Sequence, residues 1–297
     1  MHLYATGTMA ADLFLGLDLS TQSMTAVVVE RTGAVVARSS VNYDEELPGY
    51  KTSSGMHRAP EGDSERVTSP VSMWLEALDM VLERVGRTGV LGRVVAVSAS
   101  AQQHGSVYWK AGARQQLQAL GASAVAQRPL KDALAGCFAC EHCPIWADSS
   151  TAEECAAMET ALGGAERLAA MTGSRAYPRF TAQQFARMSR RHPDVWAACE
   201  RVSLVSSFVS SLLSGDYAAI DTADASGMNL MLLTERKWSD AACNAAAPGL
   251  REKLGPEPIE PWTVLGPVCA YWRSRHGFAP SCAVVCSSGD NPNALVR

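Results

Sequence analysis

The fold expected for this chain is decided by residues 13–23, whose sequence is LFLGLDLSTQS. An apolar run from Leu13 to Leu19 is interrupted by one carboxylate, Asp18, and is followed by the polar residues 20–23. The apolar run predicts a buried strand, and the polar residues predict a turn. An acidic residue in a buried strand is costly unless it has a partner or a function, so Asp18 is a candidate functional residue.

The residues that follow predict two more strands and then a helix. Residues 24–30 and 34–41 are rich in β-branched and apolar side chains, and the turn 31–33 separates them. After a loop over 42–70 we expect a helix with Ser69 as its N-cap, Pro70 in its first turn and an apolar stripe from Trp74 to Val85.

Strands and helices also alternate in the rest of the chain. Residues 94–98 and 282–286 predict buried strands, and each runs into a polar segment. We expect a second long loop over about 110–143, and helices at roughly 151–163, 165–172, 181–192 and 202–213. The mixture indicates an α/β fold.

Composition and charge restrict the partners of the chain. The 297 residues are 47% hydrophobic, the formal net charge is −4 and the pI is about 5.9. Nucleic acids and anionic lipid surfaces attract basic patches, so the sequence predicts no nucleic-acid and no membrane partner. No apolar run approaches the roughly 18 residues of a membrane span. Residues 1–12, which we interpret as a leader, lack the features of a secretion signal, so we expect a cytoplasmic protein.

Nine cysteines include one cluster, Cys137, Cys140 and Cys143, with His142 beside it. This spacing permits a zinc or iron–sulfur site. However, the sequence has no second paired cluster, and an odd number of cysteines without a secretion signal does not indicate a disulfide framework. We interpret these cysteines as buried or half-exposed thiols.

The first hairpin has the residue types of a phosphate-binding loop. Its polar turn, residues 20–23, can offer backbone N–H groups and hydroxyls to phosphate oxygens. The carboxylate of Asp18 can meanwhile hold a metal-bound water. A purely structural turn is the alternative interpretation.

The end of the chain carries a second candidate. Gly289, Asp290 and Asn291 follow a buried strand, and Asp290 can lie at the N-terminus of a helix, where an ionised carboxylate is stabilised. Such an aspartate at a cleft can accept a proton from an attacking hydroxyl, as phosphoryl transfer to an alcohol requires. The alternative is an aspartate that only caps the helix.

Eight segments in a fixed order give the chain a family resemblance. It resembles the FGGY carbohydrate kinases, and among them the xylulose kinases of eukaryotic type. The segments cover nearly the whole chain from Phe14 onwards. They are LGLDLSTQSM (15–24), TSPVSMWLEALD (68–79), AQQHGSVYWKAGA (101–113), CPIWADSST (143–151), MTGSRAYPRFT (171–181), SLVSSF (203–208), IDTADASGMNL (220–230) and SSGDNP (287–292).

The resemblance implies an actin-like ATPase fold of the ribonuclease H-like type and gives the candidates roles. Asp290 would be the general base that deprotonates the terminal hydroxyl of the sugar. His104, Arg175 and Asn291 would bind the sugar hydroxyls together with Asp290, and Gln103 lies beside His104 on the same loop. A core histidine and a surface ion-pair partner are the alternative interpretations of His104 and Arg175.

The resemblance places ATP and Mg²⁺ at the first hairpin. Asp18 would lie near Mg²⁺, held through water, and near the transferring phosphate. The phosphate loop would be formed by Thr21, Gln22 and Ser23. Two further aspartates, Asp148 and Asp224, would support the site, whereas we interpret Asp221 as a cap or loop residue.

The family comprises two-domain kinases, and this predicts a domain organisation. Residues 1–12 would be the leader, 13–278 the sugar-binding N-terminal domain, and 279–297 the start of a truncated nucleotide-binding domain. The family's later phosphate and adenosine segments are absent from the sequence. We therefore expect the residues from 279 onwards to be poorly packed, with no sheet for their last strand, and the chain alone to have weak or no kinase activity.

The function implied is transfer of the γ-phosphate of ATP to the C5 hydroxyl of D-xylulose, which gives D-xylulose 5-phosphate and ADP. Another ketose or polyol as the substrate is one alternative. A non-catalytic sugar-binding fragment is the other, and it belongs to a different class of function. A sugar panel would separate the substrates, and the transcript sequence beyond Arg297 would separate the classes.

Overall fold

The computed structural model describes residues 12–59, 63 and 65–295. Residues 1–11, and with them nearly all of the predicted leader, lie outside the described residues. Within the described part of the chain, no helix has the length and apolar character that crossing a membrane requires.

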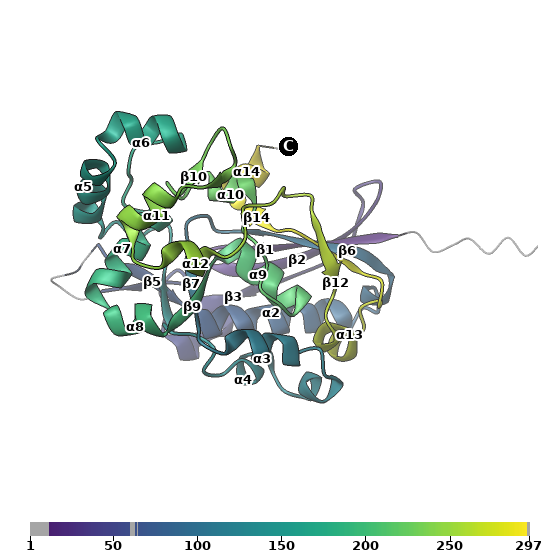
Figure 1. Cartoon of the computed structure of the whole chain (residues 1–297). Helices are drawn as coiled ribbons and strands as arrows, with labels where there is room; N and C mark the ends of the chain where they lie inside the picture. Colours follow the sequence, from purple (N-terminus) through teal and green to yellow (C-terminus); the bar gives the residue numbers. More distant parts are fainter. Residues whose placement is uncertain (1–11, 60–62, 64, 296–297) are drawn as a thin grey trace, which may run out of the picture.

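One mixed sheet forms the centre of the molecule (Figure 1). Its strands lie in the order β12-β13-β6-β1-β2-β3, and β14 also pairs with β6. β1, β2 and β3 form an antiparallel meander, whereas β1, β13 and β14 run parallel to β6. The bounds are β1 (Leu13–Leu19), β2 (Ser23–Glu30), β3 (Val35–Asn42), β6 (Val94–Ala101), β12 (Val264–Pro267), β13 (Ala283–Val285) and β14 (Ser288–Gly289). The three predicted opening strands and the α/β fold are confirmed.

Strand β1 lies in the middle of this sheet because its side chains alternate. Leu13, Leu15, Leu17 and Leu19 are buried on one face, while Asp18 is half-buried on the other. Each buried leucine removes enough apolar surface from water to contribute about 1.5–3 kcal/mol relative to an exposed one. The period of two therefore fixes the register and leaves Asp18 at the carboxyl end of the strand.

Two helices cover the sheet. α2 (Val71–Gly86) packs on β2 and β3, and α9 (Val205–Ser214) packs on β6, β13 and β14. The predicted stripe of α2 is buried, as Trp74 and Val85 show. The predicted cap is wrong: Pro70 stands at the N-cap in an extended conformation, and Ser69 donates its hydroxyl hydrogen bond to the carbonyl of Gly55.

The remaining elements correct two further expectations. The loop expected over 110–143 contains short helices, and the helix expected over 202–213 begins only at Val205, after strand β9. The other helices are α1 (Tyr43–Glu46), α3 (Ala113–Ala119), α4 (Leu130–Ala133), α5 (Ala152–Ala161), α6 (Ala165–Thr172), α7 (Thr181–Arg191), α8 (Pro193–Ala198), α10 (Thr222–Ala225), α11 (Asp240–Ala246), α12 (Leu250–Leu254), α13 (Ala270–His276) and α14 (Asp290–Ala294), with 3-10 helices at Pro48–Tyr50, Leu91–Arg93 and Ser123–Gln127. The other strands are β4 (His57–Arg58), β5 (Val67–Pro70), β7 (Ser106–Lys110), β8 (His142–Pro144), β9 (Cys199–Leu204), β10 (Met231–Leu232) and β11 (Lys237–Trp238).

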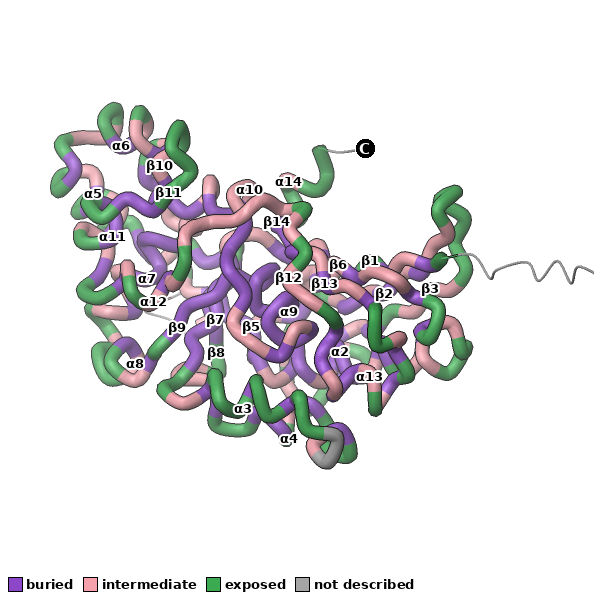
Figure 2. The backbone as a smooth tube through the Cα atoms, turned by 45° about the vertical axis from the view of Figure 1, so that its right-hand side comes forward, coloured by how far each residue is buried: buried purple, intermediate pink, exposed green. Residues whose placement is uncertain are grey.

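The end of the chain is packed into the same sheet. β13 lies between β6 and β12, and Cys282, Val284 and Ser287 are fully buried. The expectation of a poorly packed end without a sheet is therefore wrong for residues 279–289, whereas α14 has no buried residue. The reason is that β13 completes the parallel half of the sheet that β1 begins, so a boundary at residue 279 would separate two neighbouring strands. Figure 2 shows this buried centre, with α14 exposed beyond it.

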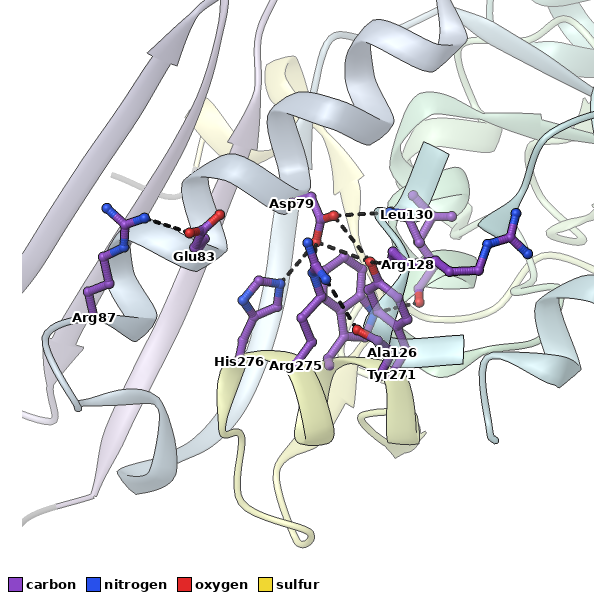
Figure 3. A network of polar contacts seen from close by, with 11 residues as sticks. Asp79, Glu83, Arg87, Ala126, Arg128, Leu130, Tyr271, Arg275 and His276 are labelled. Atoms are coloured by element: carbon purple, nitrogen blue, oxygen red, sulfur yellow. Dashed lines mark hydrogen bonds and ion pairs between the residues drawn. The ribbon is translucent and has the colours of Figure 1, made fainter. Parts of the chain in front are cut away.

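A buried carboxylate ties α13 to α2. Asp79 accepts hydrogen bonds from the backbone N–H of Leu130, the Tyr271 hydroxyl, Nε of Arg275 and Nε2 of His276, all at 3.0–3.2 Å (Figure 3). Burial alone would raise its pKa, but the hydrogen bond from His276, the bond from Leu130 and the charge of Arg275 together lower it. Asp79 therefore anchors the segment that leads into β13 to the first half of the chain.

Candidate functional site

The carboxyl ends of three parallel strands meet at one edge of the sheet. β6 is flanked by β1 and β14, and Ser100 of β6 pairs in register with Asp18 on one side and with Ser288 on the other. Asp18, the loop after Ala101 and the residue after Gly289 are therefore brought to the same edge, as parallel pairing requires.

Asp290 is the first residue of α14, and Gly289 occupies the N-cap position. Its Oδ1 accepts hydrogen bonds from the backbone N–H of Gln103 (3.2 Å), the backbone N–H of Asn291 (2.8 Å) and Nδ2 of Asn291 (3.3 Å). Nδ2 of Asn291 also donates to Oε1 of Gln103 over 3.0 Å. Asp290 is thus more than a helix cap, because its carboxylate links two loops.

Burial raises the pKa of Asp290, and the negative charge of Asp18 adds to this, while the backbone N–H groups of Gln103 and Asn291 oppose it. Asp290 is exposed on one side, and its raised pKa makes the carboxylate a stronger base than an aspartate of ordinary pKa. Among the described residues, no donor contacts its Oδ2, so that oxygen is available to a ligand.

A break between β13 and β14 lets the chain turn towards this edge. The Ser287 hydroxyl takes the place of a strand carbonyl and accepts from the backbone N–H of Ala99 over 3.1 Å, while the Ser98 hydroxyl donates to the Cys286 carbonyl. Pairing resumes at Ser288, and no side chain fits at Gly289, where a Cβ would lie 2.7 Å from Oδ1 of Asp224. These contacts determine where Asp290 is placed.

His104 follows Gln103 in a left-handed conformation, with φ of 67°. Its ring lies on Phe180, with the centroids 4.9 Å apart, and a Cβ at Gly227 would be 3.1 Å from both His104 Cε1 and Gln103 Nε2. Burial, and secondarily the charge of Arg179, lower the pKa of His104 to about 4. A hydrogen bond to the backbone of Gly227 opposes this shift but is outweighed, so the imidazole is neutral at physiological pH, and the ring nitrogen without the proton remains an acceptor.

The first hairpin is a tight turn in which Ser20 N–H donates to the carbonyl of Ser23 over 3.0 Å. The Ser20 hydroxyl donates to Oδ2 of Asp18 over 2.7 Å. Thr21 accepts from the indole N–H of Trp146 over 2.8 Å, whereas Gln22 is exposed. The three residues expected to form a phosphate loop therefore lie beside Asp18, as the sequence requires.

Arg175 is placed differently from the other candidates. Its guanidinium is 70% exposed and pairs with Glu159, with Nε 3.2 Å from Oε1. Among the described residues its side-chain hydrogen bonds go to Glu159 and not to Asp290, Asn291 or Gln103. Its role in sugar binding stays a prediction.

Three residues near this edge were missed by the sequence reasoning. The Arg179 guanidinium lies over the rings of Trp146 and Tyr177, 5.8 and 5.0 Å from their centroids. Trp146 and Tyr177 are both exposed, and both lie in segments that carried the family resemblance. Large aromatic side chains left exposed beside an arginine were the signal that could have drawn attention to them.

The two aspartates for which the resemblance implies a supporting role are buried in different environments. Asp148 accepts from the backbone N–H of Val67, from Ser150 and from Nε2 of Gln184, so it orders the loop after β8. Asp224 lies on α10 and accepts from the Ser206 hydroxyl. Asp221 caps α10 by accepting from two backbone N–H groups, which confirms its interpretation as a cap.

The cysteine cluster holds no metal site among the described residues. The thiols of Cys140 and Cys143 donate to the carbonyls of His142 and Cys140, and Cys137 is buried. All nine cysteines are free thiols, and burial raises the pKa of Cys137 to about 11. The interpretation as buried or half-exposed thiols is confirmed.

Comparison with known proteins places this geometry in a family. A model of the FGGY family of carbohydrate kinases, N-terminal domain, matches residues 140–296. A xylulose kinase of Mus musculus is 45% identical over 282 residues, which are 95% of this chain and 50% of that protein. Xylulose kinase 2 of Arabidopsis thaliana is 45% identical over 284 residues, again 95% of this chain and 50% of the relative.

Solved structures share the fold at lower identity. The crystal structure of xylulose kinase from Rhodospirillum rubrum matches with a TM-score of 0.74 at 16% sequence identity, over 96% of this chain and 50% of that one. The chain therefore spans about half the length of the curated relatives and solved structures that it matches.

Proposed function

Since this chain belongs to the FGGY family of carbohydrate kinases, we propose that it is the sugar-binding half of an ATP-dependent kinase that phosphorylates D-xylulose. The identity of 45% to the mouse and Arabidopsis xylulose kinases supports this choice of substrate. In the proposal, residues 13–295 form the N-terminal sugar-binding domain, because β13 and β14 belong to the same sheet as β1.

The observation that carries the proposal is the arrangement at Asp290. Oδ1 is held by Gln103 and Asn291, and Oδ2 receives no hydrogen bond from the described residues. A base for phosphoryl transfer must be oriented and must still have a free lone pair towards the attacking hydroxyl. We assign Asp290 as the general base that accepts the proton of the sugar hydroxyl.

The side chains around Asp290 fit a polyol. Gln103 and Asn291 supply amide groups, and neutral His104, hydrogen-bonded to the backbone of Gly227, supplies an acceptor. Because these groups are positioned by Gly227, Phe180 and each other, little ordering remains to oppose sugar binding. Arg175 would join them only after leaving Glu159.

ATP and Mg²⁺ belong to the proposal at the first hairpin. Mg²⁺ usually binds one or two protein carboxylates and takes its other ligands from substrate phosphates and water. The single half-buried carboxylate of Asp18 fits this pattern. There the ion would neutralise phosphate charge as it develops. Thr21, Gln22 and Ser23 would face the phosphates. Cytoplasmic localisation is a further part of the proposal. So is the absence of nucleic-acid and membrane partners, which the acidic composition supports.

Calorimetric titration of the chain with D-xylulose tests the sugar site. We expect saturable binding by the wild type, weaker binding by Asn291→Ala and His104→Ala, and unchanged binding by Asp194→Asn, an exposed control. Ribulose and glycerol in the same titration test the substrate: tighter binding of either would replace xylulose in the proposal. No binding of any of the three sugars would overturn it.

Turnover measures how much kinase activity this chain has alone. With ATP, Mg²⁺ and D-xylulose we expect weak or no phosphorylation by this chain, because it spans half the length of its relatives. Turnover close to that of a two-domain homologue would contradict this expectation. A non-catalytic sugar-binding fragment would also bind sugar without turnover. Asp290→Asn removes the proposed base, so any residual phosphorylation that depends on Asp290 should be lost in this variant.

A further inference from the structure

Two buried carboxyl groups stand directly behind the turn that carries Asp290. α10 contacts β14, and Figure 1 shows α10 and α14 close together near the C-terminus. Oδ2 of Asp221 accepts a hydrogen bond from the Ser288 hydroxyl over 2.9 Å. Asp224 lies against Gly289, where an added Cβ would meet its Oδ1 at 2.7 Å. Both aspartates therefore touch the two residues before Asp290.

Both carboxyl groups are buried among uncharged hydrogen-bond donors. Asp221 is 0% and Asp224 is 1% exposed, and Oδ1 of each has no hydrogen-bond partner among the described residues. Oδ2 of Asp221 accepts from two backbone N–H groups and the Ser288 hydroxyl, and Oδ2 of Asp224 accepts from the Ser206 hydroxyl. An isolated buried carboxylate costs several kcal/mol, roughly, so at least one of the pair is better accommodated as a neutral acid.

The charged groups that face Asp224 favour the proton on it, and its polar neighbours oppose this. Asp221 of α10 and Asp290 of α14 are acidic and raise its pKa, whereas hydrogen bonds from Ser206 of α9 and from the side chain of Gln103, in the loop after β6, lower it. Cys286, before β14, has a pKa that burial raises to about 12, so it is a neutral thiol. Burial and then the charge of Asp221 raise the pKa of Asp224 to about 8.

We propose that Asp224 is a positioning residue which, as a neutral acid, supports the Gly289 turn and the Gln103 loop and so holds Asp290 in place. A Cβ at Gly289 would also lie 3.0 Å from Cγ of Gln103, so Gly289, Gln103 and Asp224 are in close van der Waals contact. The proposal rests on the proposed function, in which Asp290 is the base and Gln103 lies in the sugar site. Ionisation of Asp224 adds a negative charge beside Asp290 and loosens this packing.

Stability against pH tests the protonation state without any substrate. A folded-state pKa above the unfolded value stabilises the fold below the unfolded pKa and loses that stabilisation as pH rises through the folded pKa. The Tm of the wild type should therefore fall between pH 6 and pH 9. The Tm of Asp224→Asn should fall distinctly less, because its side chain at position 224 cannot ionise. Asp79→Asn is the matched control, because Asp79 is also buried but paired, and its alkaline slope should equal that of the wild type.

D-xylulose affinity tests the positioning role. At pH 9 a group of pKa about 8 is about nine-tenths ionised, so wild-type affinity should fall up to about tenfold from pH 6. Asp224→Asn should retain its affinity within about twofold over this range, while Asp224→Ala, which leaves a gap, should bind weakly at both pH values. Equal alkaline slopes of Tm for wild type and Asp224→Asn would overturn the proposal. So would an Asp224→Asn variant that binds as poorly as Asp224→Ala. If the wild type binds no sugar but the alkaline slopes of Tm differ, the proposed function is wrong, while the assignment of Asp224 as a neutral acid is retained.

Discussion

The backbone N–H of Gln103 donates a hydrogen bond to Oδ1 of Asp290 across 3.2 Å, although the two residues are 187 positions apart in the chain. This bond joins the loop after β6 to the helix after β14. A backbone N–H has no side-chain rotamers, so this donor stays where the main chain places it. The pairing of β14 with β6 places both main-chain segments, and with them the carboxylate of Asp290. The candidate base and the candidate sugar loop therefore move as one unit.

Replacing Gly289 with alanine should disrupt this unit. The new Cβ would lie 2.7 Å from Oδ1 of Asp224 and 3.0 Å from Cγ of Gln103, and overpacking of this kind costs about 1–3 kcal/mol. We expect a lower free energy of unfolding in urea and weaker D-xylulose binding. Gly49→Ala is the control, since nothing lies within 4 Å of a Cβ there. Equal stability of the two variants would contradict the expected close packing at Gly289.

The pKa of His104 predicts a loss of stability in mild acid. Burial lowers this pKa to about 4, below the ordinary value of 6.5, so the unfolded chain takes up the proton first. The stabilisation from the neutral imidazole is complete above about pH 6.5 and is lost as pH falls towards 4; by pH 5 it amounts to at most about 2 kcal/mol. Thermal unfolding at pH 7.5 and pH 5 should show a smaller drop in Tm for His104→Gln than for the wild type. The other histidines are unchanged in both proteins, so an equal drop would rule out a buried neutral His104.

Both the backbone and the packing oppose a side chain at Gly255. A Cβ there would lie 1.1 Å from an Arg201 guanidinium nitrogen, and the backbone, with φ of 75° and ψ of −138°, lies in a region that glycine alone adopts readily. Gly277 has a similar φ of 78° but a left-handed ψ of 27°, and nothing lies within 4 Å of its Cβ position. Gly277→Ala should therefore lose about 1 kcal/mol, and chemical denaturation should show a loss for Gly255→Ala that is larger by about 1–3 kcal/mol. Equal losses would mean that both Arg201 and the backbone at residue 255 can adjust.

The sequence alone predicted the elements whose pattern is local. The alternation from Leu13 to Leu19 gave β1 and placed Asp18 at its end, and Gly289 before Asp290 marked the turn into α14. The neighbourhood of Asp290 and Gln103 followed only from the family resemblance, because no local pattern states which strands pair.

What could not be predicted depends on contacts between distant segments. β13 was expected to lack a sheet, yet it pairs with β6 almost 190 residues earlier. The indole of Trp146 donates a hydrogen bond to Thr21, 125 residues away in the chain, and no periodic pattern in the sequence predicts such a bond. The cap of α2 was misassigned for the same reason, since the Ser69 hydroxyl is already bound to the carbonyl of Gly55.

The Asp79 network predicts the largest stability effect outside the candidate site. Asp79→Asn leaves Arg275 and His276 without their carboxylate, and removing one partner of a buried pair costs about 3–5 kcal/mol. We expect a value near the lower end, because the Arg275 side chain keeps 24% exposure. Urea unfolding at pH 7 measures the loss.

Glu83→Gln is the matched control for Asp79→Asn, because Glu83 lies on the same helix one turn away and pairs with Arg87 at the surface (Figure 3). That exposed pair should contribute less than about 0.5 kcal/mol. The pH dependence has a definite sign: the lowered pKa of Asp79 stabilises the fold above the ordinary aspartate range, and this is lost as pH falls through the folded-state pKa. Wild type and Asp79→Asn should therefore converge in stability at strongly acidic pH. A constant difference down to the lowest pH at which the protein stays folded would mean that the carboxylate acts through packing and not through its charge.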